Sequence, residues 1–201
     1  MKKLLLIDGN SVLFRTYYST IYTNPMSTSS GIPTNAVYGF ISLINKAISM
    51  VRPDAMMVAW DAGKKTFRHD KMAEYKGTRK SLDEELIVQF PIVREYLDTA
   101  NICRYEQEGY EADDIIGSMA KSNPDYQTTI LTSDKDLLQL VDPTTQVILM
   151  KKGLASFDTM DEAAIQEKYG LSPKQIIDLK GLMGDPSDNI PGVAHIGEKT
   201  A

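Results

Sequence analysis

The feature that most constrains the fold is a short apolar run that recurs along the chain and is followed each time by aspartate. The runs and the carboxylates that follow them are 4–7 with Asp8, 55–60 with Asp61, and 129–132 with Asp134 and Asp136. Runs that are apolar throughout are typical of strands buried on both faces, as in a parallel sheet covered by helices. The chain is therefore predicted to form an α/β fold with a mainly parallel central sheet flanked by helices.

Helical patterns lie between and after these runs. Apolar residues recur at helical spacing over 37–51, and a shorter helix is expected over about 11–22. Capping boxes predict helices starting at Ser81, where Pro91 should kink the helix, at Thr159, where Gly170 should end it, and at Ser172, with an end near Met183. Further strands are expected at 147–150 and 102–105, and from Thr159 onward the sequence predicts helices only.

A second acidic feature is the stretch Gly109–Asp114, which contains Glu111, Asp113 and Asp114. An aspartate after a strand is more often a turn former or a helix N-cap, so no single carboxylate proves a site. In parallel sheets, however, the carboxyl ends of the strands line the functional crevice. Crowded carboxylates there need cations, and oxygen ligands without His or Cys favour Mg²⁺ or Mn²⁺. Two such ions, about 4 Å apart, serve in-line displacement at phosphodiesters.

Composition narrows the class of protein. The 201 residues carry a net charge of −5, and Cys103 is the only cysteine, so no intrachain disulfide can form and a reducing cytoplasm is expected. The apolar run after Met1 is too short for a signal peptide, and no run is long enough to cross a membrane. The basic segment, residues 64–80, is the exception to the acidity, with seven Lys or Arg against two acidic residues. It is either a nucleic-acid contact or a solvated charged face.

The C-terminal stretch adds two carboxylates, Asp185 and Asp188, and a glycine-rich turn. Gly192 and Gly197 bracket a tight turn into a helix expected near Glu198. Backbone N–H groups at such a turn suit a DNA phosphate, although an ordinary helix hairpin has the same pattern.

Six groups of residues, taken in order, resemble the 5′→3′ exonuclease domain of the bacterial DNA polymerase I family and its flap endonuclease relatives. The motifs are Ile7-Asp8-Gly9-Asn10, Trp60-Asp61-Ala62, Phe67-Arg68 with Glu74-Tyr75-Lys76-Gly77-Thr78-Arg79, Gly109-Tyr110-Glu111-Ala112-Asp113-Asp114, Thr132-Ser133-Asp134-Lys135-Asp136, and Gly184-Asp185-Pro186-Ser187-Asp188-Asn189-Ile190-Pro191-Gly192-Val193. The resemblance covers almost the whole chain. It implies a metal-dependent, structure-specific nuclease of PIN-like fold that cuts DNA near 5′ flaps, nicks or ends.

The resemblance also implies roles for individual residues. One metal ion would be held by Asp8, Asp61, Glu111, Asp113 and Asp134, and a second by Asp136, Asp185 and Asp188, with Asp114 reaching either ion through water. The basic segment would form a helical arch, about 64–90, for the 5′ strand. Within it, Lys76 and Arg79 would stabilise the scissile phosphate and Tyr75 could stack on a base. The expected DNA-binding residues are Arg68, Lys76, Arg79, Gly192, Gly197 and Lys199.

The organisation implied is a nuclease core over 1–158 and the start of a helix-three-turn-helix module over 159–201. The family continues beyond Ala201, so we expect this module to be truncated here, and a polymerase domain could follow in the native protein. We expect a monomer. Ala194 and His195 stand where the family often has Pro and Gly, which weakens the expectation of a phosphate or monovalent cation contact at the turn.

Two other functions are compatible with these residues. One is a DNA junction-binding module that does not cut. The other is a single-strand ribonuclease of the same fold, which would need neither the basic segment nor the glycine turn. The presence of every expected carboxylate favours a cleaving enzyme.

Overall fold

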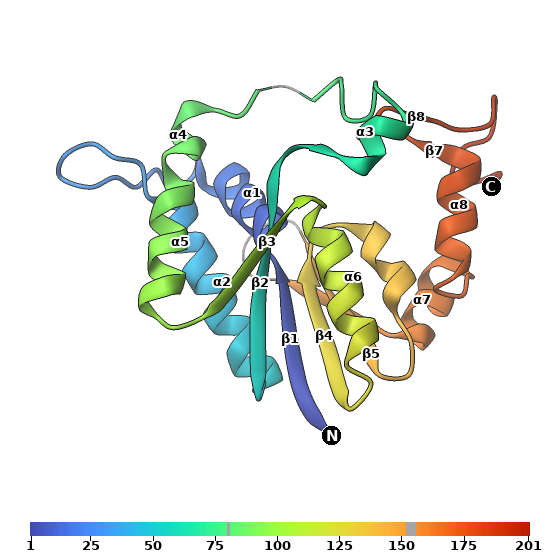
Figure 1. Cartoon of the computed structure of the whole chain (residues 1–201), viewed down its shortest axis with the longest axis horizontal. Coiled ribbons are helices and arrows are strands. Elements are labelled where there is room, and N and C mark those ends of the chain that lie inside the picture. Colours follow the sequence, from blue (N-terminus) through green and yellow to red (C-terminus); the bar gives the residue numbers. More distant parts are fainter. Residues whose placement is uncertain (80, 152–155) are drawn as a thin grey trace.

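The computed structural model of the chain describes residues 1–79, 81–151 and 156–201. These residues include a six-stranded sheet with the strand order β3-β2-β1-β4-β5-β6. The strands are β1 (Lys2–Asp8), β2 (Ala55–Thr66), β3 (Cys103–Gly109), β4 (Tyr126–Thr132), β5 (Thr145–Met150) and β6 (Phe157–Met160). The first five are parallel and β6 is antiparallel to β5. The predicted mainly parallel α/β fold is thus confirmed (Figure 1).

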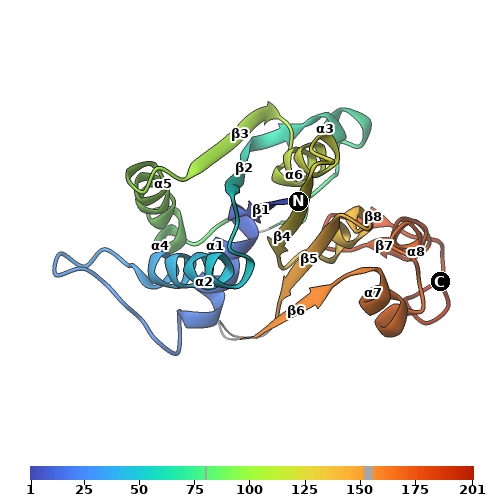
Figure 2. The ribbon, with the colours of Figure 1, turned by 90° about the horizontal axis from the view of Figure 1, so that it is seen from below.

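Helices cover both faces of this sheet (Figure 2). On one face lie α1 (Gly9–Thr20), α2 (Asn35–Val51), α4 (Glu84–Ile87) and α5 (Gln89–Thr99), and on the other lie α6 (Ala112–Ser122), the 3₁₀ helix η1 (Lys135–Leu140), α7 (Glu162–Tyr169) and α8 (Gln175–Met183). Successive β1 residues point to opposite faces, so Leu5 joins the first core and Leu6 the second. This double burial explains why residues 4–7 of β1 are all apolar.

The join between β1 and α1 depends on Gly9. A Cβ at this position would lie 2.7 Å from the ring of Trp60, which is itself fully buried. Only glycine lets α1 start this close to β2. The helix therefore begins at Gly9, two residues earlier than expected, and Asp8 is its N-cap.

Strands β2 and β3 extend several residues beyond their predicted C-terminal ends. β2 does not end at Asp61 but continues to Thr66, with a register shift against β3 between these two residues. β3 runs to Gly109, although its sequence Cys-Arg-Tyr-Glu-Gln-Glu-Gly is largely polar. An edge strand leaves much of its surface in water, so it needs no apolar run. The continuous apolar run that identified the central strands is therefore absent from β3.

The basic segment is helical only near its start, in α3 (Phe67–Lys71), and residues 73–78 form turns. Lys80 lies outside the described residues. The predicted capping box at Ser81 is wrong, because Asp83 is the N-cap of α4 and makes no side-chain capping hydrogen bond. Helix α4 ends at Ile87. In a continuous α-helix the Ile87 carbonyl would accept a hydrogen bond from the N–H of residue 91, and Pro91 has no N–H to donate. The expected kink is thus a break between α4 and α5.

The C-terminal part is not wholly helical. Helices α7 and α8 occupy the predicted regions, but the capping box predicted at Thr159 is wrong, because Thr159 lies in β6 and Asp161 is the N-cap of α7. A small antiparallel hairpin follows α8. The hairpin consists of β7 (Gly184–Asp185) and β8 (Ile190–Pro191). Residues 193–201 contain turns, not the helix expected near Glu198. The proposed boundary at 158/159 falls inside β6, and the division into core and module stays a prediction.

No helix in the described ranges combines the length and the apolar character needed to cross a bilayer.

Candidate active site

The carboxyl edge of the sheet brings β1 and β4 together at Asp8. This side chain is buried and accepts hydrogen bonds from the Ser11 N–H (2.9 Å) and the Thr132 hydroxyl (2.9 Å). Burial raises the pKa of Asp8 to about 7, assisted by the nearby carboxylates of Asp61 and Asp134 and opposed by the two hydrogen bonds. A buried carboxylate of this kind is costly when ionised unless a cation approaches it.

The start of α6 adds Glu111 and Asp113. Helix α6 is placed against β2 by Asp61, whose Oδ1 accepts the Ala112 N–H at 2.8 Å. Burial raises the pKa of Asp113 well above its ordinary value, and the charges of Asp8, Asp134 and Asp61 raise it further. The acidic stretch and the strand-end carboxylates thus meet, although they are far apart in sequence.

A third group of carboxylates joins η1 to the C-terminal hairpin. Lys180 on α8 contacts Asp136 at 2.8 Å and Asp185 at 2.9 Å. Burial raises the pKa of Asp136 despite this lysine. At Asp185, burial is outweighed by the hydrogen bonds from Ser187 and Lys180, and the pKa falls to about 2. Lys180 therefore supplies the positive charge that these two carboxylates require.

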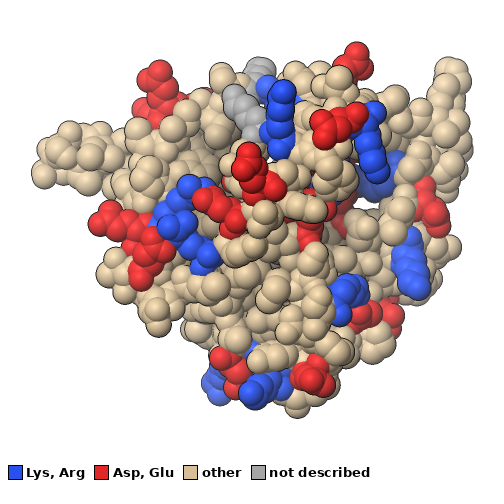
Figure 3. Space-filling view, viewed as in Figure 1, with Lys and Arg blue, Asp and Glu red and all other residues tan. Residues whose placement is uncertain are grey.

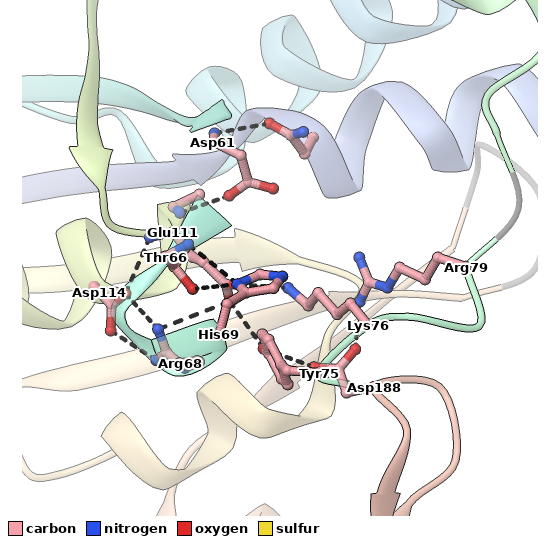
Figure 4. A network of polar contacts seen from close by, with 12 residues as sticks. Asp61, Thr66, Arg68, His69, Tyr75, Lys76, Arg79, Glu111, Asp114 and Asp188 are labelled. Atoms are coloured by element: carbon pink, nitrogen blue, oxygen red, sulfur yellow. Dashed lines mark hydrogen bonds and ion pairs between the residues drawn. The ribbon is translucent and has the colours of Figure 1, made fainter. Parts of the chain in front are cut away.

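The basic segment crosses above this edge, and its side chains reach the carboxylates (Figures 1 and 4). The Lys76 ammonium lies 2.8 Å from Glu111, and Arg79 pairs with Asp188. The Tyr75 hydroxyl donates toward Glu111 (3.1 Å) and Asp188 (3.0 Å). The ring of Tyr75 is buried and packs edge-on to His69, so in this conformation it does not offer a face for stacking on a base. The base-stacking role of Tyr75 stays a prediction.

Most of these side chains, but not Asp136 or Tyr75, line one cavity of about 420 Å³. Its wall includes seven of the nine predicted metal ligands, namely Asp8, Asp61, Glu111, Asp113, Asp134, Asp185 and Asp188. Four basic side chains also line it, namely Lys76, Arg79, Lys135 and Lys180. The space-filling view shows acidic and basic side chains side by side along this edge of the molecule (Figure 3). The cavity is therefore polar, and its wall carries both negative and positive charges.

The structure places Asp114 apart from the cavity. Its two oxygens accept a bidentate pair of hydrogen bonds from Arg68, at 2.7 and 2.8 Å, and Oδ2 also accepts the Glu111 N–H at 3.0 Å. Burial opposes ionisation of Asp114, but the hydrogen bonds from Arg68 and Glu111 lower its pKa. Arg68, predicted to bind DNA, is thus engaged in joining α3 to α6 (Figure 4).

The two glycines predicted to bind DNA, Gly192 and Gly197, lie outside the cavity. A Cβ on Gly192 would lie 2.2 Å from the Met183 carbonyl carbon, because β7 and β8 pack backbone against backbone. Gly197 has open space where a Cβ would be, and Lys199 is exposed. Gly192, Gly197 and Lys199 do not line the cavity. Their proposed contact with DNA stays a prediction.

Several residues of the site were missed in the sequence. Lys180 is one lysine on a helix, and nothing in the pattern around it marks it. The Ser11 hydroxyl in α1 accepts the Ser133 N–H at 2.8 Å and so ties the start of this helix to the end of β4, while the Asn10 side chain accepts the Asp61 N–H at 3.1 Å. The available signal was that Asn10 and Ser11 closely follow Asp8 in the sequence. The first residues of a helix that follows a strand lie at the same edge of the sheet as the end of that strand.

The metal-ligating atoms that this site offers suit a divalent metal ion. Within the part of the chain that the structure describes, no three His, Cys, Asp or Glu side chains already converge as a metal site. The lining donors are nevertheless carboxylate oxygens, the class that Mg²⁺ and Mn²⁺ prefer. Two of these carboxylates, Asp8 and Asp113, have raised pKa values that a nearby cation would lower.

Comparisons with known proteins agree with this geometry. The family model for the 5′-3′ exonuclease N-terminal resolvase-like domain matches residues 3–170, and the model for the 5′-3′ exonuclease C-terminal SAM fold matches residues 171–201. The chain is 49% identical to DNA polymerase I of Bacillus caldotenax over 100% of its own length and 23% of that protein. It is 42% identical to a 5′-3′ exonuclease of Bacillus subtilis over 99% of its own length and 68% of that protein.

The fold also matches solved structures. The phage T5 5′-exonuclease with bound zinc ions has a TM-score of 0.78 and 24% identity, with 99% of this chain and 73% of that chain covered. A T5 flap endonuclease complex with DNA and metal ions has a TM-score of 0.77 and 24% identity, with 98% of this chain and 72% of that chain covered. The chain spans about a quarter of the length of the DNA polymerase I relatives. From both family models and these identities, the chain belongs to the 5′-3′ exonuclease family, whose members include the N-terminal part of bacterial DNA polymerase I.

Proposed function

We propose that this protein is a metal-dependent, structure-specific 5′ nuclease that hydrolyses phosphodiester bonds of DNA near 5′ flaps, nicks or ends. The observation that carries the proposal is the single cavity in which seven carboxylates meet beneath Lys76 and Arg79. Carboxylates alone would repel a polyanion. Acidic residues under basic ones suit a phosphate held together with divalent cations.

We propose that Asp8, Asp61, Glu111, Asp113 and Asp134 hold one Mg²⁺ or Mn²⁺ ion, and that Asp136, Asp185 and Asp188 hold a second. When bound, two such ions supply an activated water and stabilise the leaving oxygen of an in-line displacement. The T5 structures with bound metal ions and with DNA support this proposal for a chain of the same fold. A monovalent cation at the glycine turn is a further proposal, and no contact in the described residues supports it.

The chain's own residues would position the substrate. Lys76 and Arg79 now pair with Glu111 and Asp188. A phosphate entering the cavity would compete for these cations, and metal ions would take over the carboxylates. Each basic side chain would then donate to a phosphate oxygen and offset negative charge as the bond breaks. Asp8 and Asp134 would contact metal and not the phosphate.

The substrate proposed is DNA with a 5′ single-strand/duplex junction, and the protein would act as a monomer in the cytoplasm. A polymerase domain following this chain is proposed from the DNA polymerase I relatives, which extend well beyond the matched part. These features would connect the activity with replication and repair.

A 5′-flap duplex tests the proposed function directly. Incubated with the full-length protein, it should be cut in Mg²⁺ and remain intact in EDTA, and Asp134→Ala should abolish cutting while binding persists. Binding without metal-dependent cleavage by the unmodified protein would support a non-cleaving module. Preference for unstructured RNA over the DNA flap would support a ribonuclease.

A further inference from the structure

Two segments far apart in the sequence are joined directly above the cavity. The Asn189 side-chain amide donates to the Glu74 carbonyl at 2.8 Å, and the Lys76 N–H donates to the Asp188 carbonyl at 2.9 Å. These bonds connect the turns at 73–78 with the turn between β7 and β8. The first segment carries Lys76, and the second carries Asp188.

The backbone of Lys76 needs this connection. Its φ is 55°, in the left-handed region, where a residue with a Cβ is disfavoured by roughly 1–2 kcal/mol. Such a conformation persists only when the surrounding structure holds it. The neighbouring Gly77 N–H also donates to the Glu74 carbonyl, at 2.9 Å, so the carbonyl that Asn189 holds closes the turn containing Lys76.

The conformation of this turn decides where the Lys76 ammonium points. With φ at 55°, the side chain reaches into the cavity and contacts Glu111 at 2.8 Å. A return to the right-handed or extended region would redirect the side chain. An error of about 1 Å in the position of a group that acts on the reacting bond can cost about 100-fold in rate.

We propose that Asn189 is a positioning residue for the nuclease reaction. Its side-chain amide holds the Glu74 carbonyl and so keeps Lys76 in the left-handed conformation that directs its ammonium into the carboxylate cavity. Asn189 does not touch the cavity itself; it acts through Lys76. The inference rests on the proposed function for the role of Lys76, while the contact between the segments is independent of it.

A simpler role for Asn189 is that of a turn former, since its own φ is 60°. Asparagine tolerates this region, and glycine adopts it without steric cost. An Asn189→Gly variant therefore keeps the turn and removes only the amide. Asn101→Gly is a matched control, because Asn101 is exposed, has a φ of 54° and lies in the turn before β3.

The first readout is the single-turnover cleavage rate of a saturating 5′-flap duplex in Mg²⁺, measured on the full-length protein. Asn189→Gly should lower this rate about tenfold, a loss of roughly 1.4 kcal/mol of transition-state stabilisation, while Asn101→Gly should leave it unchanged. The dissociation constant for the same DNA in EDTA should change less than threefold. In a Lys76→Ala background, Asn189→Gly should have less than a twofold effect, because the group it positions is gone.

The second readout does not depend on activity. Trypsin cleavage after Lys76 and Arg79 should be faster in Asn189→Gly than in wild type and Asn101→Gly, at equal melting temperature. Equal trypsin cleavage in the two glycine variants, or rate losses that add in the double variant, would overturn the positioning role. An unmodified protein that never cuts DNA would instead overturn the proposed function, and the trypsin comparison would still decide whether Asn189 holds the segment. If Asn189→Gly folds poorly, Asn189→Asp replaces the donor by an acceptor in a residue of the same shape and should reproduce both effects.

Discussion

At the scale of single residues, the buried carboxylate of Asp8 suits the proposed metal binding but lowers the folding stability when it is ionised without a metal ion. Its pKa is about 7 in the folded protein, against 3.8 for an unperturbed aspartate, chiefly because the side chain is buried. Below about pH 4 the carboxyl is protonated in both states and costs nothing. As the pH rises toward 7, the unfolded chain releases the proton while the folded chain keeps it, so folding stability falls.

The Asp8→Asn variant should therefore be more stable than wild type in EDTA, and more so at pH 8 than at pH 5. The gain should be of the order of a few kcal/mol at most, since the buried charge is removed while an oxygen remains for the Ser11 N–H. Thermal melts at the two pH values measure it, with Asp125→Asn, an exposed aspartate, as the control. A gain independent of pH would show that the ionisation of Asp8 is not its source.

At the scale of elements, burial decides what could be predicted from sequence. β1, β4 and β5 each contain a buried, mainly apolar run, so their positions were predicted within a few residues. β3 is a polar edge strand, and the two-residue strands β7 and β8 are too short to show a period. The basic segment is short of apolar residues, and its turns are fixed by contacts with the C-terminal hairpin. No local pattern could reveal those contacts.

The ion pair between Arg68 and Asp114 joins two such elements, α3 and α6. Arg68→Ala should lower the free energy of unfolding by about 1 kcal/mol, because a bidentate, half-buried pair is lost and Asp114 is left without its cation. Arg104→Ala is the matched control, since Arg104 makes a bidentate pair with the exposed Asp98 and should matter less. Urea unfolding of both variants measures the difference. Equal losses would mean that α3 is not held through Arg68.

At the scale of the whole molecule, the candidate site joins segments from one end of the chain to the other. The strand-end aspartates were predictable because parallel strands end at one edge. Lys180 and Asn189 were not, because each gains its role from a segment that folding brings near. Asp114 illustrates the opposite error, a residue whose neighbours in sequence suggest a role in the site that its position does not support. It stands beside Asp113 in sequence, yet it faces Arg68 and not the cavity.

The charge of the cavity gives a prediction about the whole fold. Seven carboxylates line it against four basic side chains, and this excess of negative charge adds to burial in raising the pKa values of Asp8 and Asp113. An ion that binds only the folded state stabilises it by about 2.7 kcal/mol at 100 times its dissociation constant. Millimolar Mg²⁺ should therefore raise the melting temperature at pH 8.

The control for this prediction separates binding from screening of surface charge. Asp134→Asn removes a carboxylate of the cavity and should reduce the Mg²⁺-dependent rise, whereas Asp158→Asn alters an aspartate paired with Lys151 and Lys168 and should not. NaCl at equal ionic strength should produce no such rise, because monovalent salt only screens. The same rise in both variants, or in NaCl, would mean that Mg²⁺ acts on the surface in general. A rise confined to proteins with Asp134 would place the cation among the strand-end carboxylates, where the parallel sheet collects them.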